Sequence, residues 1–425
     1  MNNQRLELVT DFYEYTMANG YFNKNMEDKI AYFDVFFRKV PNEGGYAIVA
    51  GLEQIINYIR NLSFDEEDIS YLRKQNKFSE EFLNYLENFR FTGDIWAIPE
   101  GTVVFPNEPL ITVKAPIIQA QLLETMLLLT TNHQSLIATK TSRIVKEAQG
   151  RPVMEFGARR AHGINAAVEG ARAAIIGGAV GTSCTLSAKE FNVPASGTMA
   201  HSWIQSFDSE YEAFKAYAEL YPDDCTFLID TYNTIESGLP NAIKVFNEVL
   251  KPKGYRPKAV RLDSGDLAYL SKKVRKILDE AGYEDCKICA TNSLDEYLIK
   301  SLIEQDAKID LFGVGENLIT AKSEPVFGGV YKLVALEKDK KIVPKIKVSE
   351  NTAKVTNPSF KKVYRFYDNE TKKAIADVIT LADEIIDERE YMIFDPQNPW
   401  KKKVLKDYSI RLLQEKIFEE RKINI

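Results

Sequence analysis

The chain has 425 residues, of which 45% are hydrophobic and 27% charged, and its formal net charge is −6 at pH 7. The composition excludes a disordered chain, and the length exceeds what one hydrophobic core ordinarily organises, so two or three domains are expected. The mildly acidic balance excludes a protein that holds nucleic acid by its overall charge, but it leaves room for a local cationic pocket that binds a small anion.

Membrane association is not expected from the sequence either. No apolar run approaches membrane-spanning length, and residues 1–17 contain no apolar signal segment. Cys286 and Cys289 form a C-x-x-C inside a predicted buried strand, without a second pair at zinc spacing. We therefore expect core thiols, and a cytoplasmic protein with neither a membrane nor a nucleic acid as its partner.

Residues 1–120 predict an N-terminal α/β domain. An aromatic-rich helix is expected in the first 30 residues, with Thr10 or Asp11 as its N-cap. Alternating β-formers then predict a strand, apolar residues at helical spacing predict helices, and Pro and Gly turns separate short strands. These elements fall, in order, in residues 29–41, 44–62, 64–92 and 94–116.

The middle of the chain, residues 121–335, predicts a β/α barrel. After a long apolar helix or helix pair at 119–150, short apolar strands alternate with helices, the clearest of which covers 267–283. Strands joined by helices run parallel, and the number of units favours a closed or nearly closed barrel, with an open doubly wound sheet as the alternative. The predicted strands are 153–156, 179–182, 193–195, 226–229, 259–262, 287–290, 309–312 and 329–334.

The last part of the chain, residues 336–425, is charged and irregular in pattern. It predicts a β-rich segment followed by a Lys-rich surface helix that runs to the end. The three consecutive lysines at 401–403 are expected on a solvated face.

Polar and glycine residues cluster directly after almost every strand of the predicted barrel. Because the loops at the carboxyl ends of parallel strands converge, that edge is the active face of such folds. One cluster alone would mean little, since turns need these residue types, but the succession predicts a functional site. The clusters are residues 155–160, 181–183, 196–201, 230–233, 261–266, 291–293 and 313–317.

The residue types in these clusters suit a small anionic ligand with a flat ring. Backbone N–H groups at a G-x-G suit phosphate oxygens, although a tight turn explains that pattern equally well. Arginines fix carboxylates or diphosphates by paired hydrogen bonds, while carboxylates bind ribose hydroxyls or hydrated Mg²⁺, or cap helices. The candidates are Gly313 and Gly315 for phosphate, Arg159, Arg160 and Arg261 for anions, Asp230 and Asp263 for hydroxyls or Mg²⁺, and Phe156 and Tyr13 for stacking.

Six motifs in order resemble the nicotinate phosphoribosyltransferase family. They read TDFYEYTMANGYF, EFGARRAHG, VPASGTMAHSW, FLIDTYNTIESG, VRLDSGDL, and FGVGENLITA followed by GGVYKL. The resemblance implies transfer of the phosphoribosyl group of 5-phosphoribosyl 1-diphosphate to nicotinate in NAD biosynthesis, with Mg²⁺ and with ATP hydrolysis through a phosphohistidine. It also implies a homodimer with shared active sites, and an irregular β/α barrel beside an α/β domain in which residues 336–425 pack back on the N-terminal domain.

The resemblance implies a role for each candidate residue. His201 is the phosphorylated residue, and Phe156 stacks the pyridine ring together with Tyr13 of the partner subunit. The remaining roles are nicotinate binding by Thr198 and Arg261, diphosphate binding by Arg159 or Arg160, ribose binding by Asp230, Asp263 and Ser264, and a cradle for the 5′-phosphate formed by Gly313, Gly315, Glu316 and Asn317.

Ser183 bears on the choice of pyridine. Related nicotinamide-using enzymes place an Asp here, which accepts from an amide N–H, whereas a Ser does not repel a carboxylate, so nicotinate is favoured over nicotinamide. A phosphate-binding lyase or aldolase is a weaker alternative. Such an enzyme needs a lysine at a strand end to form a Schiff base, and none of the strand-end clusters given above contains one. A non-catalytic ligand-binding paralogue is another, although binding alone does not need the histidine.

Overall fold

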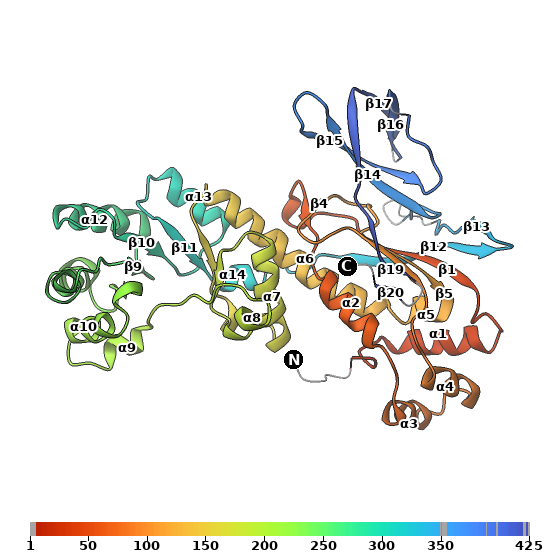
Figure 1. Ribbon diagram of the computed structural model, residues 1–425, viewed down its shortest axis with the longest axis horizontal. Helices are drawn as coiled ribbons and strands as arrows, with labels where there is room; N and C mark the ends of the chain where they lie inside the picture. Colours follow the sequence, from red (N-terminus) through yellow and green to blue (C-terminus); the bar gives the residue numbers. More distant parts are fainter. Residues whose placement is uncertain are drawn as a thin grey trace. The chain divides into compact units, whose positions relative to one another are not determined.

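The computed structural model describes residues 6–423 apart from 349, 351–354, 388, 397 and 420–421. The chain divides into two compact units (Figure 1). Unit 1 consists of Met1–Ser135 and Val326–Ile425, and unit 2 of Leu136–Pro325. Both ends of the chain therefore share unit 1. Residues 121–135 and 326–335, which the sequence assigns to the barrel, also belong to unit 1.

Unit 1 is built on a seven-stranded sheet in which β1 (Ile30–Phe37) is an interior strand and almost wholly buried. Its apolar run IAYFDVFF covers both faces of the strand, as a fully covered strand requires. The order is β13 (Lys341–Pro344), β12 (Gly329–Lys338), β1, β5 (Ile111–Pro116), β3 (Asp94–Ala97), β19 (Glu415–Glu419) and β20 (Lys422–Ile423), and a separate pair joins β2 (Ala47–Ile48) to β4 (Val103–Val104).

The assignment of residues 329–334 to the barrel is wrong. They form the start of β12, which pairs antiparallel with β1 in unit 1. The ring of Tyr331 stacks on Phe33 across this pair, with centroids 4.7 Å apart. An apolar run predicts a strand, but it does not predict which other strand pairs with it. Here the pairing strand, β1, comes from the beginning of the chain.

The helices of unit 1 follow the predicted pattern, and the 119–150 segment is a helix pair. Asp11 occupies the N-cap position of α1 with an extended backbone, without a side-chain capping bond. The helices are α1 (Phe12–Phe22), α2 (Leu52–Asn61), α3 (Glu66–Lys74), α4 (Glu80–Glu87), α5 (Ile117–Gln121) and α6 (Glu124–Glu147), the last of which continues into unit 2.

Glu14 on α1 gives the stability of unit 1 a dependence on pH. Its side chain is buried, one oxygen accepts a hydrogen bond from Thr125 Oγ1 at 2.5 Å, and the other has no partner. Burial raises the pKa of Glu14 from 4.5 to about 7. The unfolded chain ionises this group near pH 4.5, so its contribution to stability is complete below that pH and is lost as the pH rises through 7.

Replacing Glu14 with Gln is therefore expected to stabilise the protein at pH 8 but not at pH 4.5. The amide keeps the oxygen that accepts from Thr125 and never ionises, so the gain in the free energy of unfolding at pH 8 is about 2 kcal/mol. Urea unfolding of both proteins at the two pH values measures the difference. A difference that is the same at both pH values would show that Glu14 does not titrate in this range.

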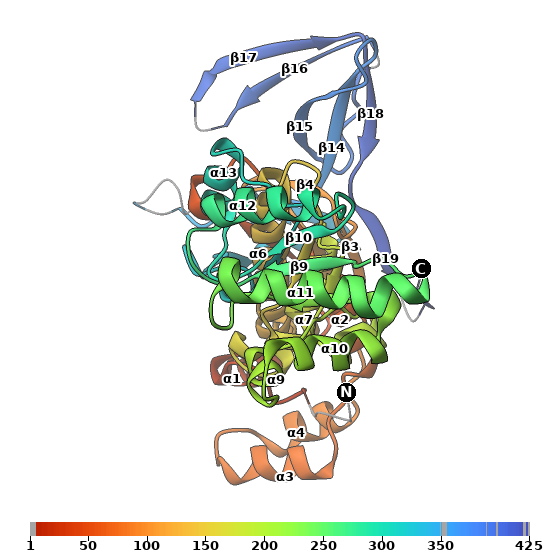
Figure 2. The ribbon, with the colours of Figure 1, turned by 90° about the vertical axis from the view of Figure 1, so that its left-hand side faces the viewer.

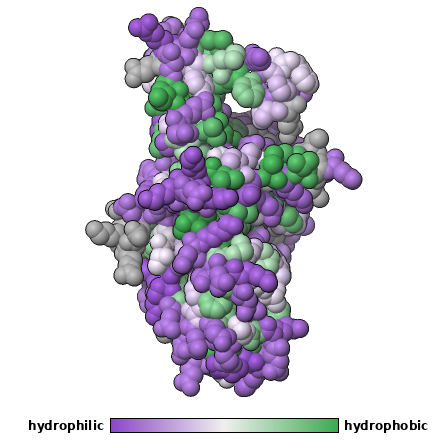
Figure 3. Space-filling model, turned by 90° about the vertical axis from the view of Figure 1, so that its right-hand side faces the viewer, coloured by the Kyte–Doolittle hydropathy of each residue, from purple (hydrophilic) through white to green (hydrophobic). Residues whose placement is uncertain are grey.

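The C-terminal part of unit 1 forms a second set of strands (Figure 2). Strands β15 (Ala374–Leu381), β14 (Lys361–Asp368) and β18 (Tyr408–Leu412) make one sheet, and β16 (Glu390–Asp395) and β17 (Asn398–Lys406) make a hairpin. Figure 3 shows one face of unit 1, where hydrophilic side chains predominate and hydrophobic ones form small separate groups.

The Lys-rich surface helix predicted for the end of the chain is wrong, because the described residues from 398 onward form strands. Lys402 lies opposite Phe394 in the hairpin, and Lys406 pairs with Glu390 at 3.3 Å across it. Leu405 points the other way, into a cluster with Phe366 and Tyr408. The lysines are exposed as expected, and Leu405 is the one buried residue of β17.

Unit 2 holds the predicted parallel strands. Each hydrogen-bonded pair in its six-stranded sheet runs parallel, and Thr182 extends the edge by a single bridge to Ala195. The predicted strand 193–195 is thus reduced to one bridge. The order is β7 (Gly181–Thr182), β6 (Val153–Glu155), β11 (Leu311–Val314), β10 (Lys287–Ala290), β9 (Ala259–Leu262) and β8 (Thr226–Leu228).

This order decides between the two predicted architectures. Except between β7 and β8, which are the two edges of the sheet, each strand lies beside its neighbour in sequence, and the last strand, β11, pairs with the first, β6. That is the order of a barrel, whereas a doubly wound sheet reverses direction in its middle. Within the described residues no pairing joins Ala195 to β8, so the barrel is irregular and open at that point.

The helices of unit 2 connect its strands. They are α7 (Ile164–Ile176), α8 (Thr185–Glu190), α9 (His201–Gln205), α10 (Glu210–Leu220), α11 (Leu239–Val245), α12 (Leu267–Glu280), α13 (Glu296–Glu304) and α14 (Glu316–Ile319). Cys286 and Cys289 are buried with free thiols, and burial raises the pKa of each to about 12, as expected of core thiols. Among the described residues, no helix combines the length and the apolar character needed to cross a membrane.

Candidate active site

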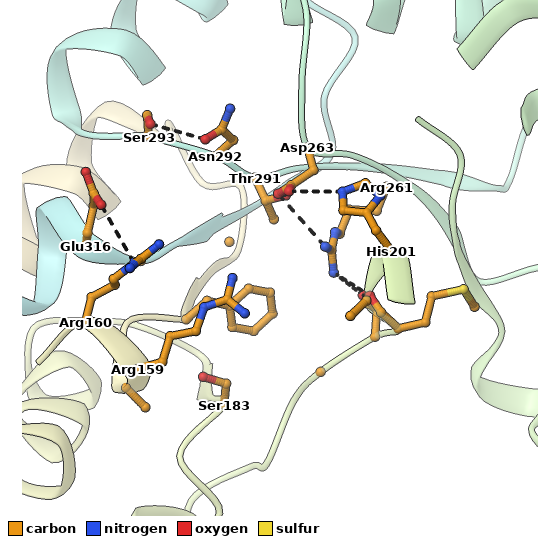
Figure 4. Close-up of a pocket in the computed structure, with 18 residues that line it drawn as sticks. Arg159, Arg160, Ser183, His201, Arg261, Asp263, Thr291, Asn292, Ser293 and Glu316 are labelled. Atoms are coloured by element: carbon orange, nitrogen blue, oxygen red, sulfur yellow. Dashed lines mark hydrogen bonds and ion pairs between the residues drawn. The ribbon is translucent and has the colours of Figure 1, made fainter. Parts of the chain in front are cut away.

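A pocket of about 530 Å³ lies at the carboxyl ends of the strands of unit 2 (Figure 4). Its walls come from the loops after β6, β7, β9, β10 and β11 and from the segment that follows Ala195. Its lining residues are Phe156, Ala158, Arg159, Arg160, Ser183, Gly197, Thr198, Met199, Ala200, His201, Arg261, Asp263, Thr291, Asn292, Ser293, Gly313, Gly315 and Glu316.

A buried carboxyl group fixes the first two loops. Glu155, the last residue of β6, accepts hydrogen bonds from the Gly157 N–H and, at 2.6 Å, from the Thr182 hydroxyl. Burial raises the pKa of Glu155. Its backbone carbonyl accepts from the Ser183 N–H at 2.9 Å, so the loops that carry Phe156 and Ser183 are tied to one residue.

The ring of Phe156 forms a flat wall that depends on a glycine. A Cβ on Gly313 would lie 2.6 Å from Phe156 Cδ2 and 2.8 Å from Thr291 Cγ2, closer than carbon atoms approach. Only glycine at this position leaves the ring where it is. An aromatic ring in the wall of a polar pocket suits a flat heterocycle.

Arg261 on β9 is the best-buried cation of the pocket, with 14% of its side chain exposed. Its Nη1 donates to the Thr198 hydroxyl and, at 3.2 Å, to the Met199 carbonyl. Its Nη2 lies 3.9 Å from Asp263 Oδ1, and its Nε has no hydrogen-bond partner although it is buried. A guanidinium held in this way is oriented in advance for a small anion.

His201 is the first residue of α9, and its imidazole is 40% exposed. Nδ1 lies 3.1 Å from the Thr231 hydroxyl, and Nε2 lies 3.6 Å from Asp263 Oδ2. The ring is thus oriented from two sides by groups that follow β8 and β9, while a part of it stays accessible to a ligand in the pocket (Figure 4).

Two carboxylates, Asp230 and Asp263, follow strands β8 and β9 near His201. Asp230 Oδ2 accepts from the Asp263 N–H at 2.9 Å and from the Ser264 hydroxyl at 2.5 Å, whereas its Oδ1 is buried without a hydrogen-bond partner. Asp263 accepts from the Thr291 hydroxyl. Mg²⁺ is bound in proteins by one or two carboxylates with water and substrate phosphate as the other ligands, so this unsatisfied oxygen fits such an ion. Among the described residues no cluster of three or more His, Cys, Asp or Glu is placed as a metal cage.

The two neighbouring arginines differ in their surroundings. Arg160 Nε lies 4.0 Å from Glu316 Oε2, and Lys322 binds the same carboxylate at 3.1 Å. Figure 4 shows Arg159 pointing toward the middle of the pocket, and no ion pair with another described residue neutralises it.

Most of the predicted site residues line this pocket, and four do not. Asp230, Ser264 and Asn317 lie behind the lining: the first two bond each other, and Asn317 Nδ2 donates to the carbonyls of Ser293 at 2.9 Å and Leu294 at 3.2 Å. Tyr13 lies on α1 in unit 1, with 46% of its side chain exposed.

Several residues that shape the pocket lie in the predicted strand-end clusters, but the sequence assigned them no role of their own. Thr291, Asn292 and Ser293 line it, Thr231 orients His201, and Glu155 fixes two loops. Each follows or ends a predicted strand, so the signal was the same as for the residues that were chosen.

Comparisons with known proteins show the family of the chain. The family model described as "Nicotinate phosphoribosyltransferase (NAPRTase) family" matches residues 152–380, which contain the whole pocket lining. The chain belongs to the nicotinate phosphoribosyltransferase family. Models of the N-terminal and C-terminal domains of nicotinate phosphoribosyltransferase match residues 8–132 and 360–424.

Individual members of the family are similar over nearly the whole chain. The nicotinate phosphoribosyltransferase of Bacillus subtilis is 47% identical over 416 residues, which cover 98% of this chain and 84% of that protein. The crystal structure of human nicotinic acid phosphoribosyltransferase aligns with a TM-score of 0.85 at 26% identity, covering 97% of this chain and 90% of that one. A nicotinate-nucleotide pyrophosphorylase from Pyrococcus furiosus shares the fold, with a TM-score of 0.76 at 24% identity over 100% and 93% of the two chains.

Proposed function

We propose that the chain transfers the phosphoribosyl group of 5-phosphoribosyl 1-diphosphate to nicotinate, forming nicotinate mononucleotide and diphosphate in NAD biosynthesis. The observation that carries this function is the pocket itself. The pocket is lined by the aromatic ring of Phe156, by the guanidinium of Arg261 and by several strand-end loops. The chain that forms it belongs to the nicotinate phosphoribosyltransferase family.

Nicotinate suits one side of the pocket. Its pyridine ring fits against Phe156, and its carboxylate is complementary to Arg261, which Thr198 and the Met199 carbonyl hold in place. Ser183 supports the choice of acid over amide, because a hydroxyl accommodates a carboxylate that an aspartate at this position would repel.

The phosphorylated substrate occupies the other side. The backbone N–H groups of the Gly313–Gly315 loop and the 291–293 turn suit the 5′-phosphate, and Arg159 suits the diphosphate because it carries no competing ion pair among the described residues. Asp230 and Asp263 would hold Mg²⁺, which supplies positive charge to the departing diphosphate when it is bound.

The reaction needs positioning more than a protein nucleophile. The pyridine nitrogen attacks C1 of the ribose while the C1–O bond to diphosphate breaks, and the arginines stabilise the negative charge that develops on the leaving group. Phe156 and Arg261 fix the direction of the nitrogen, because they hold the ring and its carboxylate separately.

His201 is proposed to couple the reaction to ATP. A neutral imidazole accepts a phosphoryl group, and the Thr231 hydroxyl orients this ring at the border of the pocket. We also propose that two chains form a dimer in which Tyr13 of the partner subunit completes the aromatic wall, because the ring of Tyr13 is half exposed on α1.

The alternatives lack support in the pocket. A lyase or aldolase that forms a Schiff base needs a lysine, and none of the described lining residues is one. A binding protein without catalysis would not need His201 beside the substrate pocket.

The function is tested by supplying the purified protein with phosphoribosyl diphosphate, ATP, Mg²⁺ and either pyridine. We expect nicotinate mononucleotide to form with kcat/KM at least about 100-fold above that for nicotinamide, because the carboxylate is the group that Arg261 recognises. The variant Ser183→Asp is expected to reduce this ratio. Equal kcat/KM values for the two pyridines would contradict the proposed specificity.

A further inference from the structure

The turn after β10 has an unusual backbone where it lines the pocket. Asn292 and Ser293 both have left-handed conformations, with φ of 79° and 51°. Such a conformation costs a residue other than glycine about 1 kcal/mol or more, and two in succession persist only when the surrounding structure holds them. Both residues face the pocket (Figure 4), so whatever holds the turn also shapes the site.

One support comes from the loop after β11. The buried Asn317 side chain donates to the carbonyl of Ser293 at 2.9 Å and to that of Leu294 at 3.2 Å. Asn317 directly follows Gly315 and Glu316, which line the pocket themselves. The two loops on which a phosphate would rest are therefore joined by one amide.

A second support is a buried ion pair beneath the turn. Lys140 on α6 places its Nζ 2.8 Å from Glu296 Oε1, 2.7 Å from Glu296 Oε2 and 3.0 Å from Ser323 Oγ. The two charged side chains are only 2% and 7% exposed. Glu296 is the first residue of α13, which the turn enters, and Ser323 lies just past α14. Lys140 thus binds Glu296, which follows the turn after β10, and Ser323, which follows the loop after β11.

This pair is poorly explained by stability alone. Burying two charges costs several kcal/mol per ion, and apolar side chains of similar volume are often as stabilising or more so. Neither Lys140 nor Glu296 lines the pocket, so neither touches a substrate. What a charged pair provides, and an apolar pair does not, is a fixed position for the start of α13 relative to α6 and Ser323.

We propose that the Lys140–Glu296 ion pair is a positioning device that sets the 291–293 turn for binding the phosphate groups of the donor substrate. Lys140 fixes the start of α13, Asn317 fixes the carbonyl side of the turn, and the left-handed residues are held between them. The inference rests on the proposed function in one respect, namely that phosphoribosyl diphosphate binds in this pocket.

The test compares Lys140→Met with the double variant Lys140→Met/Glu296→Leu. The single variant leaves a buried carboxylate, so we expect a lower Tm together with a KM for phosphoribosyl diphosphate raised about tenfold, while the KM for nicotinate changes less than twofold. The double variant is expected to regain the Tm but to keep the raised KM. Titration calorimetry with inorganic diphosphate and Mg²⁺ gives a binding constant that does not depend on turnover, and it is expected to weaken in both variants.

The matched control is Lys361→Met, which breaks another buried ion pair. Lys361 Nζ lies 2.8 Å from Asp34 Oδ2 in unit 1, with side chains 5% and 2% exposed. This variant is expected to lower the Tm without raising the KM for the donor substrate. A KM and a diphosphate affinity of wild-type value in the double variant would overturn the proposal. Wild-type protein that binds diphosphate but makes no mononucleotide would instead contradict the proposed function, and the binding constants of the variants would still decide the inference.

Discussion

Replacing Arg261 with alanine is expected to lower kcat/KM for nicotinate by a factor of about 10³. The side chain is largely buried, and it holds the Thr198 hydroxyl and the Met199 carbonyl as well as facing Asp263. Its loss removes the cation that recognises the carboxylate and leaves Asp263 to repel that carboxylate. Steady-state kinetics with nicotinate as the varied substrate measure the change.

Two further variants serve as controls for the Arg261→Ala result. Arg261→Lys keeps the charge but not the planar fork, so it is expected to recover only part of the loss. Arg256→Ala breaks an exposed ion pair with Asp285, in which Arg256 Nε lies 3.0 Å from Oδ2, and it is expected to change kcat/KM less than twofold. An Arg261→Ala enzyme within tenfold of wild type would show that nicotinate is held elsewhere.

Replacing His201 with alanine is expected to abolish the stimulation of turnover by ATP, together with ATP hydrolysis, while slow transfer without ATP remains. The imidazole is the group proposed to accept the phosphoryl group, but the walls that hold the two transfer substrates are formed by other residues. Turnover is measured with and without saturating ATP, and the release of inorganic phosphate is followed in parallel.

Thr231→Val is the matched control for His201. It removes the hydroxyl that lies 3.1 Å from Nδ1 and keeps the imidazole and nearly the same volume. The loss of one hydrogen bond predicts a fall of about 2–10-fold in ATP-stimulated turnover, not its abolition. If His201→Ala turns over at the wild-type rate with saturating ATP, the histidine does not couple ATP to transfer.

The sequence predicted the local elements of unit 2 well because their signals are local. The apolar runs at 259–262 and 287–290 coincide with β9 and β10, and the amphipathic period at 267–283 gives α12, which ends at Glu280. The failures lie where distant parts of the chain decide the outcome. Residues 329–334 are a strand as predicted, but pairing with β1, far away in sequence, places them in unit 1.

The prediction of a helix at the end of the chain failed for a related reason. Lysines at 401–403 suit an exposed helix and an exposed strand equally, and it is the pairing of β17 with β16 that makes these residues a strand. In the site, residue types at strand ends were sufficient to select most of the lining. They did not reveal that Asn317 supports the 291–293 turn from behind, because that depends on a contact between two loops.

Nicotinate is proposed to receive its phosphoribosyl group in the strand-end pocket of unit 2. A crystal structure of the chain with nicotinate mononucleotide tests this proposal most directly. We expect the pyridine ring against Phe156, its carboxylate within hydrogen-bond distance of Arg261, and the phosphate between Gly315 and Asn292. Nucleotide bound at another place on the chain, with this pocket empty, would show that the transfer takes place elsewhere.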